Sequence, residues 1–498
     1  MWTFKVDTQL PRLAWVASVT NNQELSVEVI HGENVEVGEN FFIEGAWESE
    51  YKNMNFENAI FLMGSGGKQL NNKIIFSTPS HTHERLYSIE RIDQFLISNS
   101  LPLLLNESNN ELKNDYLHYE KDFDSILKGI SNYKETIPLS NENLRVHYYR
   151  NILLSKNLKI TILEKNTIEA FKDYNDYYNR ILNIFKGIVN NSRDDRRKLQ
   201  YGLVTTISQG YDAAACAALA RKVGCNTALT FDAPKKYAED DGTEIAKKLG
   251  YLNIVKKDAN EYLKNKKFKE TEFLASAELG NGIVFSAFED EFKNNLVVIG
   301  ERGDQIWDKN KKTPNNNLIF KEANVNSSLG EHRLNTSYIF LPISLFGITE
   351  WVSVHKLSNS NEMDKYSIGG NYDRPIPRRI VEESGVPREM FGQAKKGAGF
   401  NYKYDNKSRI KKRMSEKSFN DFINYYNKNK GNRILVLGKN IKFIWNLRNI
   451  YLSHFLKKLG ISYKRKSVVK DLYNPGASSF LFKWSINKLQ NKYKENRY

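Results

Sequence analysis

Short apolar runs separated by turn residues dominate the first 110 residues of the chain. LSVEVI, FFIEGAW, AIFLMG, NKIIFST and DQFLIS hold alternating or β-branched apolar side chains. Such runs are typical of strands. Among them, Gly64-Ser65-Gly66-Gly67-Lys68 has the composition of a hairpin loop, and although it looks like a phosphate loop, no long helix follows it. The pattern predicts a β-rich domain with this segment at a turn.

The next segment leads from the β-rich domain into a helix. Residues 115–165 mix charged, helix-favouring sequence with one strand-like run, LKITILEK. FKDYNDYYNRILNIFKGIVNN follows, and its apolar residues recur at helical spacing. They are Tyr178, Ile181, Leu182, Phe185 and Ile188. We therefore place the β-rich domain at residues 1–165 and expect a helix to open a second domain.

Between residues 200 and 300, apolar strands alternate with helices. GLVTTI, NTALTF and NNLVVIG are strand-like, whereas DAAACAALARKVG and DGTEIAKKLG are helix-like and each ends in Gly. This alternation predicts a parallel sheet with both faces covered by helices. Ligands of such sheets bind at the carboxyl ends of the strands. We expect an α/β domain over residues 166–400.

A basic region ends the chain. Residues 401–498 hold 24 Lys and Arg against 5 Asp and Glu, whereas the whole chain carries +16, so residues 1–400 sum to about −3. In FLFKWSINKLQNKY, the apolar residues Phe482, Ile486, Leu489 and Tyr493 fall on one helical face. This basic, mostly helical extension is expected to pack on its own core or to contact an anionic surface, either a membrane or a nucleic acid.

Composition narrows the class of protein. No apolar run approaches the ~20 residues that a transmembrane helix needs, and the amino-terminal segment lacks the order of a secretory signal. The two cysteines, Cys216 and Cys225, are too few for a disulfide framework or a multi-cysteine zinc site. We expect a cytoplasmic protein, peripheral to the membrane if its basic end binds lipid.

The first chemistry-bearing motif lies in TTISQGYDAAACAALARKVG, residues 205–224. A strand runs into Ser208-Gln209-Gly210 and then into a helix, whose first N–H groups and dipole favour an anion. Asp212 is an acid in this position, and it is explained if Mg²⁺ lies beside a polyphosphate. No Gly-Lys-Ser/Thr follows, so this is not a Walker loop. Ser, Gly and Asp also cap ordinary helices.

Two further motifs follow along the chain. Gly300, Glu301 and Asp304 come directly after the strand-like LVVI, in the turn GERGDQ. Lys395 lies in FGQAKKG, after the helical stretch RPIPRRIVEESGVPREM. Each motif alone is weak, because acidic turns and lysine pairs are common on surfaces.

Together, the three motifs resemble those of the asparagine synthetase family. The family's Ser-Gly-Gly-x-Asp-Ser loop is matched by Ser208, Gly210 and Asp212, with Gln209 in place of a Gly and Ala213 in place of the second Ser. Its Ser-Gly-Glu-Gly-x-Asp-Glu motif is matched by Gly300, Glu301 and Asp304, and its late Arg-x-Lys by Lys395. The resemblance runs from about residue 170 to 400. It implies an ATP pyrophosphatase domain of the HUP-like, adenine-nucleotide alpha-hydrolase fold.

The resemblance also implies an activity and a site. Such enzymes bind ATP and Mg²⁺, adenylate a carboxylate and transfer nitrogen to the acyl carbon. It assigns Asp212 and Asp304 to the metal, and Lys395 and Glu301 to catalysis. The residues that it assigns to ATP and pyrophosphate are Thr206, Ile207, Ser208, Gln209, Gly210, Asp212, Ala213, Thr230 and Gly300.

The β-rich domain carries its own resemblance. ERLYSIERIDQFLISNSLPLLL, residues 84–105, is similar to the end of the family's glutaminase domain, an α+β, Ntn-hydrolase-like fold. That glutaminase uses an amino-terminal cysteine as nucleophile, whereas this chain begins Met1-Trp2. We therefore expect no glutamine hydrolysis, as in β-lactam synthetase-like members. Ammonia, an ammonia-donating partner or an amine on the substrate would then supply nitrogen.

The sequence leaves three classes of function open. The first is an amide ligase acting on a small-molecule or glycan-type carboxylate. The second is a tRNA-modifying ATP pyrophosphatase, whose basic end would grip phosphates. The third is a nucleotide-binding protein that has lost catalysis, which the substitutions at Gln209 and Ala213 permit.

Overall fold

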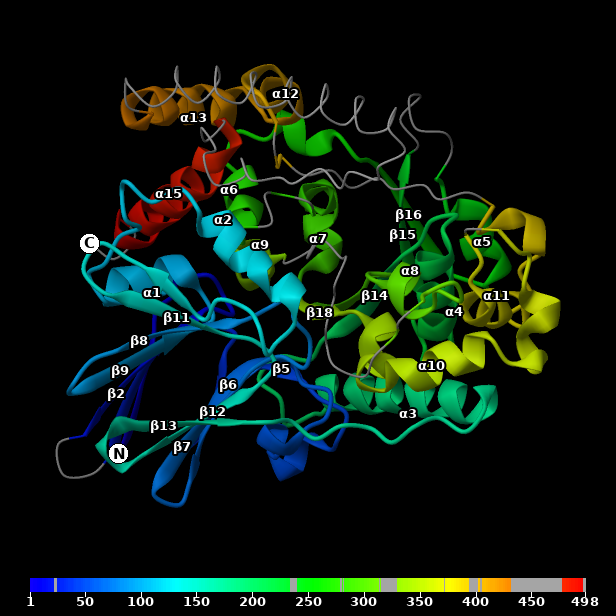
Figure 1. Cartoon of the computed structure of the whole chain (residues 1–498), viewed down its shortest axis with the longest axis horizontal. Coiled ribbons are helices and arrows are strands. Elements are labelled where there is room, and N and C mark those ends of the chain that lie inside the picture. Colours follow the sequence, from blue (N-terminus) through cyan, green and yellow to red (C-terminus); the bar gives the residue numbers. More distant parts are fainter. Residues whose placement is uncertain are drawn as a thin grey trace, which may run out of the picture.

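The computed structural model describes residues 1–21, 25–232, 240–277, 280, 282–312, 314, 329–370, 372–393, 402–403, 405–430 and 477–495. Figure 1 shows a β-rich unit at the amino-terminal end, an α/β unit beside it, and carboxyl-terminal helices along one edge. The predicted α/β architecture with a β-rich amino-terminal region is confirmed at this level. The domain limits at residues 165 and 400 stay predictions.

Two sheets form the β-rich unit. A seven-stranded sheet has the order β1-β3-β2-β9-β8-β11-β10, and a six-stranded sheet has the order β13-β12-β7-β6-β5-β4. Trp15 of the first sheet meets Phe42 of the second at 4.7 Å between ring centroids, so the sheets pack face to face over an apolar core. The strands are β1 (Trp2–Val6), β2 (Trp15–Asn21), β3 (Leu25–His31), β4 (Glu36–Val37), β5 (Phe41–Ala46), β6 (Met63–Leu70), β7 (Lys73–Ser77), β8 (Leu86–Glu90), β9 (Gln94–Ser98), β10 (Thr136–Pro138), β11 (Asn143–His147), β12 (Asn151–Ser155) and β13 (Lys159–Leu163).

The prediction of a turn at Gly64–Lys68 is wrong, because these residues lie inside β6. A Cβ on Gly64 would stand 2.0 Å from the carbonyl oxygen of Glu44, and one on Gly67 would stand 2.7 Å from the Phe42 ring. The glycines therefore make room for the neighbouring strand and its aromatic side chain. Turn-like composition here reflects close packing within a sheet.

A parallel sheet forms the centre of the α/β unit, in the order β16-β15-β14-β17-β18. Neighbouring residues of a strand face opposite cores: Leu203 packs with helices on one face and Val204 with those on the other. Both faces are covered, as the alternation of strands and helices predicted. The strands are β14 (Gly202–Thr206), β15 (Thr227–Asp232), β16 (Asn253–Asp258), β17 (Asn295–Val298) and β18 (Ile339–Leu341).

Helices of this unit begin and end close to their predicted positions. The predicted entry helix is α3 (Tyr174–Ser192), and the two helices closed by glycine are α4 (Tyr211–Lys222) and α5 (Thr243–Lys248). Gly224 and Gly250 adopt φ of +88° and +77°, which non-glycine residues rarely adopt. The others are α6 (Glu270–Leu274), α7 (Glu289–Phe292), α8 (Gly303–Ile306), α9 (Gly330–Thr336), α10 (Trp351–Ser358) and α11 (Pro375–Glu382).

The carboxyl-terminal helices are α12 (Lys407–Arg413), α13 (Glu416–Asn429) and α15 (Leu481–Glu495). Of these, α15 packs between the β-rich unit and α6 of the α/β unit, and α12 and α13 lie beside α15 and α6. The predicted apolar face of α15 is buried against α1 (Leu101–Glu107) and α2 (Tyr119–Phe123), so this helix docks on its own protein. RILVLG and LRNIYLSHFLKKLG lie outside the described residues. Among the helices that are described, none is long and apolar enough to cross a membrane.

Candidate active site

The loop between β14 and α4 is built as an anion-binding turn. Gly210 caps α4 with extended backbone (φ −73°, ψ 153°), and no side chain occupies the cap. The N–H groups of the first helical turn have no partner within the helix, which favours an anion there. The Gly210 N–H donates to Ser208 Oγ over 3.2 Å, so the serine hydroxyl keeps its hydrogen to donate outward. Ser208, Gln209 and Gly210 therefore lie where the sequence placed them.

An acid lies against this loop. The Gln209 N–H donates to Asp240 Oδ1 over 3.2 Å, and Ser208, Gln209 and Gly210 are partly exposed. The sequence did not predict this contact, because Asp240 follows a different strand. A polyphosphate entering the loop would meet this carboxylate beside one of the loop's N–H groups.

Three carboxylates converge at the carboxyl edge of the sheet. β14 and β17 pair in parallel, so Asp212 and the turn holding Glu301 and Asp304 follow adjacent strand ends. The backbone N–H of Asp304 hydrogen-bonds the Asp212 carboxylate. Burial raises the pKa of Asp212 well above its usual range; Asp304 raises it further, Arg374 opposes the rise, and Glu301 adds to it. The structure thus brings together three acids that lie up to 92 residues apart in the sequence.

One carboxylate oxygen at this edge is buried without a partner among the described residues. Asp212 Oδ1 is buried without a hydrogen-bond partner in the described part of the chain. A Cβ on Gly303 would stand 2.7 Å from this oxygen, so only glycine leaves room beside it. The described residues contain no group of three acids, histidines or cysteines already arranged to enclose a metal ion. Mg²⁺ usually takes one or two carboxylates and completes its shell with water and phosphate oxygens, so the donors present fit that ion.

Gly300 lets the backbone of the second motif lie against the backbone of the first. A Cβ at this position would stand 2.5 Å from the backbone nitrogen of Ala213. The turn after β17 therefore approaches the first turn of α4 as closely as backbone permits. Ala213 is partly exposed, as Asp212 is, so the entrance of the helix is lined by backbone and by one carboxylate.

The residues that the family resemblance assigns to adenosine are held at two strand ends. Thr206 ends β14 and Ile207 follows it; both are buried, and the Ile207 N–H donates to the Leu229 carbonyl over 2.9 Å. Thr230 Oγ1 accepts from the Gly242 N–H at 2.9 Å, which positions the start of α5. The Thr230 hydroxyl thus holds the start of α5 in place at the edge of the sheet, beside the loop.

The third motif reaches the same edge. The Gly392 N–H donates to the Gln209 carbonyl over 2.8 Å, so the start of the third motif contacts the first loop. The amide of Gln393, which stands in the family's Arg position, donates to the carbonyls of Arg388 and Phe391. Lys395 lies outside the described residues.

The sequence did not predict a cluster of aromatic and arginine side chains that packs against the loop. Tyr211 is fully buried, its ring lies 4.9 Å from that of Tyr372, and Arg378 donates to its hydroxyl. Arg374 is 6% exposed and pairs with Asp308 at 2.8 Å. The available signal was the four-residue spacing of Arg374 and Arg378 at the start of α11, which places them on one side of that helix.

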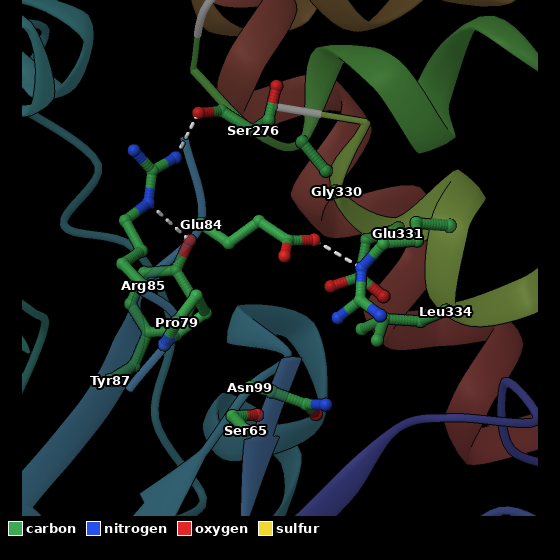
Figure 2. Close-up of a pocket in the computed structure, with 12 residues that line it drawn as sticks. Ser65, Pro79, Glu84, Arg85, Tyr87, Asn99, Ser276, Gly330, Glu331 and Leu334 are labelled. Carbon is green, nitrogen blue, oxygen red and sulfur yellow. Dashed lines mark hydrogen bonds and ion pairs between the residues drawn. The ribbon is translucent and has the colours of Figure 1, made fainter. Parts of the chain in front are cut away.

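A second polar region lies between the β-rich and α/β units. Figure 2 shows Glu84 and Arg85 of the β-rich unit beside Ser276 and Glu331 of the α/β unit. Glu84 forms an ion pair with Arg333, which also pairs with Glu44 at 2.8 Å. Arg85 donates to the hydroxyl of Tyr87 over 2.8 Å and to the carbonyl of Ser276. Burial raises the pKa of Glu84 to about 7. Because the charged groups that line this cavity all have partners within the protein, we interpret it as part of the contact surface between the two units.

Neither cysteine has the environment of a nucleophile. Cys216 and Cys225 are both buried. Burial raises the pKa of the Cys216 thiol well above its usual range and that of Cys225 to about 11. Thiolate is the reactive form, so both side chains act as small apolar groups of the core.

Comparison with known proteins gives little beyond this geometry. No protein-family profile and no curated protein sequence matches the chain. Among solved structures, it is similar to a glutamine-dependent NAD+ synthetase from Acinetobacter baumannii in complex with adenosine diphosphate, at 14% sequence identity and a TM-score of 0.22. The similarity covers 59% of this chain and 50% of that one, so the chain spans about half the length of that synthetase. A likeness at this level establishes neither fold nor activity.

Proposed function

We propose that the protein is an ATP-dependent ligase that forms AMP and pyrophosphate while it joins a carboxylate to a nitrogen nucleophile. The observation that carries the proposal is the convergence of Asp212, Glu301 and Asp304 beside the open N-terminus of α4. A helix N-terminus attracts phosphate, whereas clustered carboxylates repel it. The two features are compatible when a divalent cation lies between them, as in a bound Mg²⁺·ATP.

In this proposal the loop residues hold the pyrophosphate part of ATP. The N–H groups at the start of α4 and the Ser208 hydroxyl donate to phosphate oxygens, and Gly210 allows their close approach. Asp212 and Asp304 would hold Mg²⁺, which when bound neutralises negative charge on the phosphates. Thr206, Ile207 and Thr230 at the two strand ends would border the adenosine.

The chemistry proceeds in two displacements. A carboxylate oxygen of the substrate attacks the α-phosphorus of ATP, the bond to the β-phosphate oxygen breaks, and pyrophosphate leaves. Nitrogen then attacks the acyl carbon of the adenylate, AMP leaves with the bonding electrons, and the nitrogen loses a proton. Lys395 would stabilise the negative charge of these transition states, and Glu301 would accept that proton or contact the pyrophosphate.

The substrates are proposed by class. The acceptor would be a small-molecule or glycan-type carboxylate. Nitrogen would come from ammonia, from an ammonia-donating partner or from an amine on the substrate, because neither described cysteine is reactive. The same buried cysteines argue against thiolation chemistry of the kind that uses a cysteine pair.

Pyrophosphate release from ATP tests the proposal. Mixtures of carboxylates and amines are screened for AMP and pyrophosphate formation by wild type and by Asp212→Ala, Asp304→Ala and Asp258→Asn. Asp258 is the matched control, since it ends β16 of the same sheet and is exposed. We expect the first two variants to lose activity at least about 100-fold and the control to keep it. Equal ATP binding by wild type and Asp212→Ala, with neither releasing pyrophosphate, would contradict the proposal.

A further inference from the structure

A row of lysines lies on α12 and α13. Lys407, Lys411, Lys412, Lys417 and Lys428 are all exposed, and we call these five residues the basic ridge. Figure 1 shows the two helices along the upper edge of the molecule, with α4 and α8 of the candidate active site lower and to the right. The ridge is therefore a separate surface.

The ridge lysines have no ion-pair partner within the described residues. Of the acids on the same segment, Asp405 pairs with Arg413 at 2.9 Å and Asp421 pairs with Lys488 at 2.7 Å. Glu416 is the remaining one, and it is exposed. Nearby acids are thus mostly committed to other cations, and the ridge keeps an uncompensated positive charge.

Aromatic rings support several of the ridge side chains. The Lys407 ammonium lies 4.6 Å from the centroid of Tyr426, and that of Lys417 lies 4.8 Å from the centroid of Phe268. Lys411 lies 6.0 Å from Phe419. A lysine resting on a ring has less conformational freedom to lose when it binds a partner. The ridge is therefore partly ordered before any ligand arrives.

The apolar side chains of these helices face inward. Phe422 and Tyr426 of α13 lie 5.6 Å and 5.2 Å from Trp484 and Phe480, between ring centroids. The large apolar residues that are exposed in the described chain all lie outside α12, α13 and α15. A helix that binds a lipid surface inserts apolar side chains between headgroups, whereas the outermost apolar side chains of α13, Phe419, Ile423 and Tyr425, are only partly exposed. Instead, Asn406, Asn420 and Asn424 are exposed among the lysines.

We propose that the basic ridge binds the phosphate backbone of a nucleic acid. Lysines spaced along two helices match a polymer with a regular series of negative charges, and exposed asparagines add hydrogen-bond donors for phosphate and sugar oxygens. The fit is to backbone charge, so binding is independent of base sequence. The inference does not depend on the ligase proposal, because the two surfaces share no residue.

Fluorescence anisotropy of a labelled RNA hairpin with the full chain tests this inference. Binding should weaken with salt, with a slope of log affinity against log salt of about −4 to −5 for five phosphate contacts. A variant with all five ridge lysines changed to Gln should bind the RNA at least about 10-fold more weakly at ~100 mM salt. Its slope of log affinity against log salt should be less negative by about 4. A variant with all five ridge lysines changed to Arg keeps the positive charge and should bind the RNA as wild type does.

The matched control changes charge equally elsewhere. Lys73, Lys128, Lys156, Lys159 and Lys172 are exposed lysines distant in sequence from the ridge, and replacing them with Gln should leave RNA binding within about 2-fold of wild type. Equal losses in both glutamine variants would overturn the inference, since the effect would then be one of net charge. Binding to phosphatidylserine vesicles without binding to RNA would overturn it in favour of a membrane. Thermal unfolding checks that every variant is folded.

Discussion

Replacing Asp212 with Asn should stabilise the protein without nucleotide while it weakens nucleotide binding. In the wild type, Asp212 Oδ1 is buried without a partner, and Asp304 and Glu301 lie close enough to raise the pKa of this carboxyl group. Asn keeps the shape of Asp, removes its charge and adds an N–H donor that can face the neighbouring acids. The substitution therefore removes a repulsion that only a cation relieves.

The size of the effect follows from the buried oxygen. An unsatisfied buried polar atom costs about 1–3 kcal/mol, and more when it is charged. Because Asp212 is only partly buried as a residue, we expect the lower part of this range, about 1–2 kcal/mol of added unfolding free energy. For a domain of about 150–250 residues, that raises Tm by roughly 2–8 °C.

Differential scanning fluorimetry or calorimetry measures both the stability without nucleotide and the stabilisation by Mg²⁺·ATP. Wild type should be stabilised by Mg²⁺·ATP, by about 2.7 kcal/mol at a concentration 100 times Kd, whereas Asp212→Asn should lose most of this gain. Asp308→Asn is the control, since its carboxylate pairs with buried Arg374 at 2.8 Å. Removing that acid leaves a buried cation unpaired, so the control should unfold at a lower temperature than wild type.

One result would refute the reasoning directly. If Asp212→Asn lowers Tm without nucleotide, as the control does, the acids at this edge are paired within the protein and are not a site waiting for a cation. A rise in Tm together with undiminished stabilisation by Mg²⁺·ATP would confirm the repulsion but remove Asp212 from the metal site.

Three further substitutions test the packing described above. Gly303→Ala places a methyl group 2.7 Å from Asp212 Oδ1 and should cost about 1–3 kcal/mol in chemical unfolding, more than Gly210→Ala, whose new methyl group meets nothing closer than 3.4 Å. Burial raises the pKa of Glu331 to about 7, so its ionisation opposes folding; wild type should lose stability relative to Glu331→Gln as pH rises from about 4.5 to 7, and a constant difference in urea midpoint would contradict this. Trp484→Ala, at a fully buried position of α15, should cost about 3–5 kcal/mol, whereas a near-neutral effect would mean that this helix is not part of the core.

Local pattern predicted those elements whose side chains repeat with one regular period. α3 and the apolar face of α15 were visible in this way, because the side-chain period of a helix is a property of a short segment. α4 and β14 were visible from composition instead, as an Ala-rich stretch closed by glycine and a continuous apolar run. β16 was missed because it is a polar edge strand, and β10, β11 and β12 because charged residues surround them. The glycines of β6 were misread because their reason, close contact with β5, is not local.

The sequence by itself determined that Asp212 and Asp304 each follow a strand of a predicted parallel sheet, whereas the tertiary structure decided that these two strands, β14 and β17, are neighbours. Parallel strands share one carboxyl edge, so Asp212 and Asp304 had to lie near each other once those strands paired. Only the tertiary structure decided that Asp240 lies against the loop, that Arg378 contacts Tyr211 from behind, and that one oxygen of Asp212 is left without a partner. These contacts join segments distant in the chain, and their geometry depends on packing that no local pattern records.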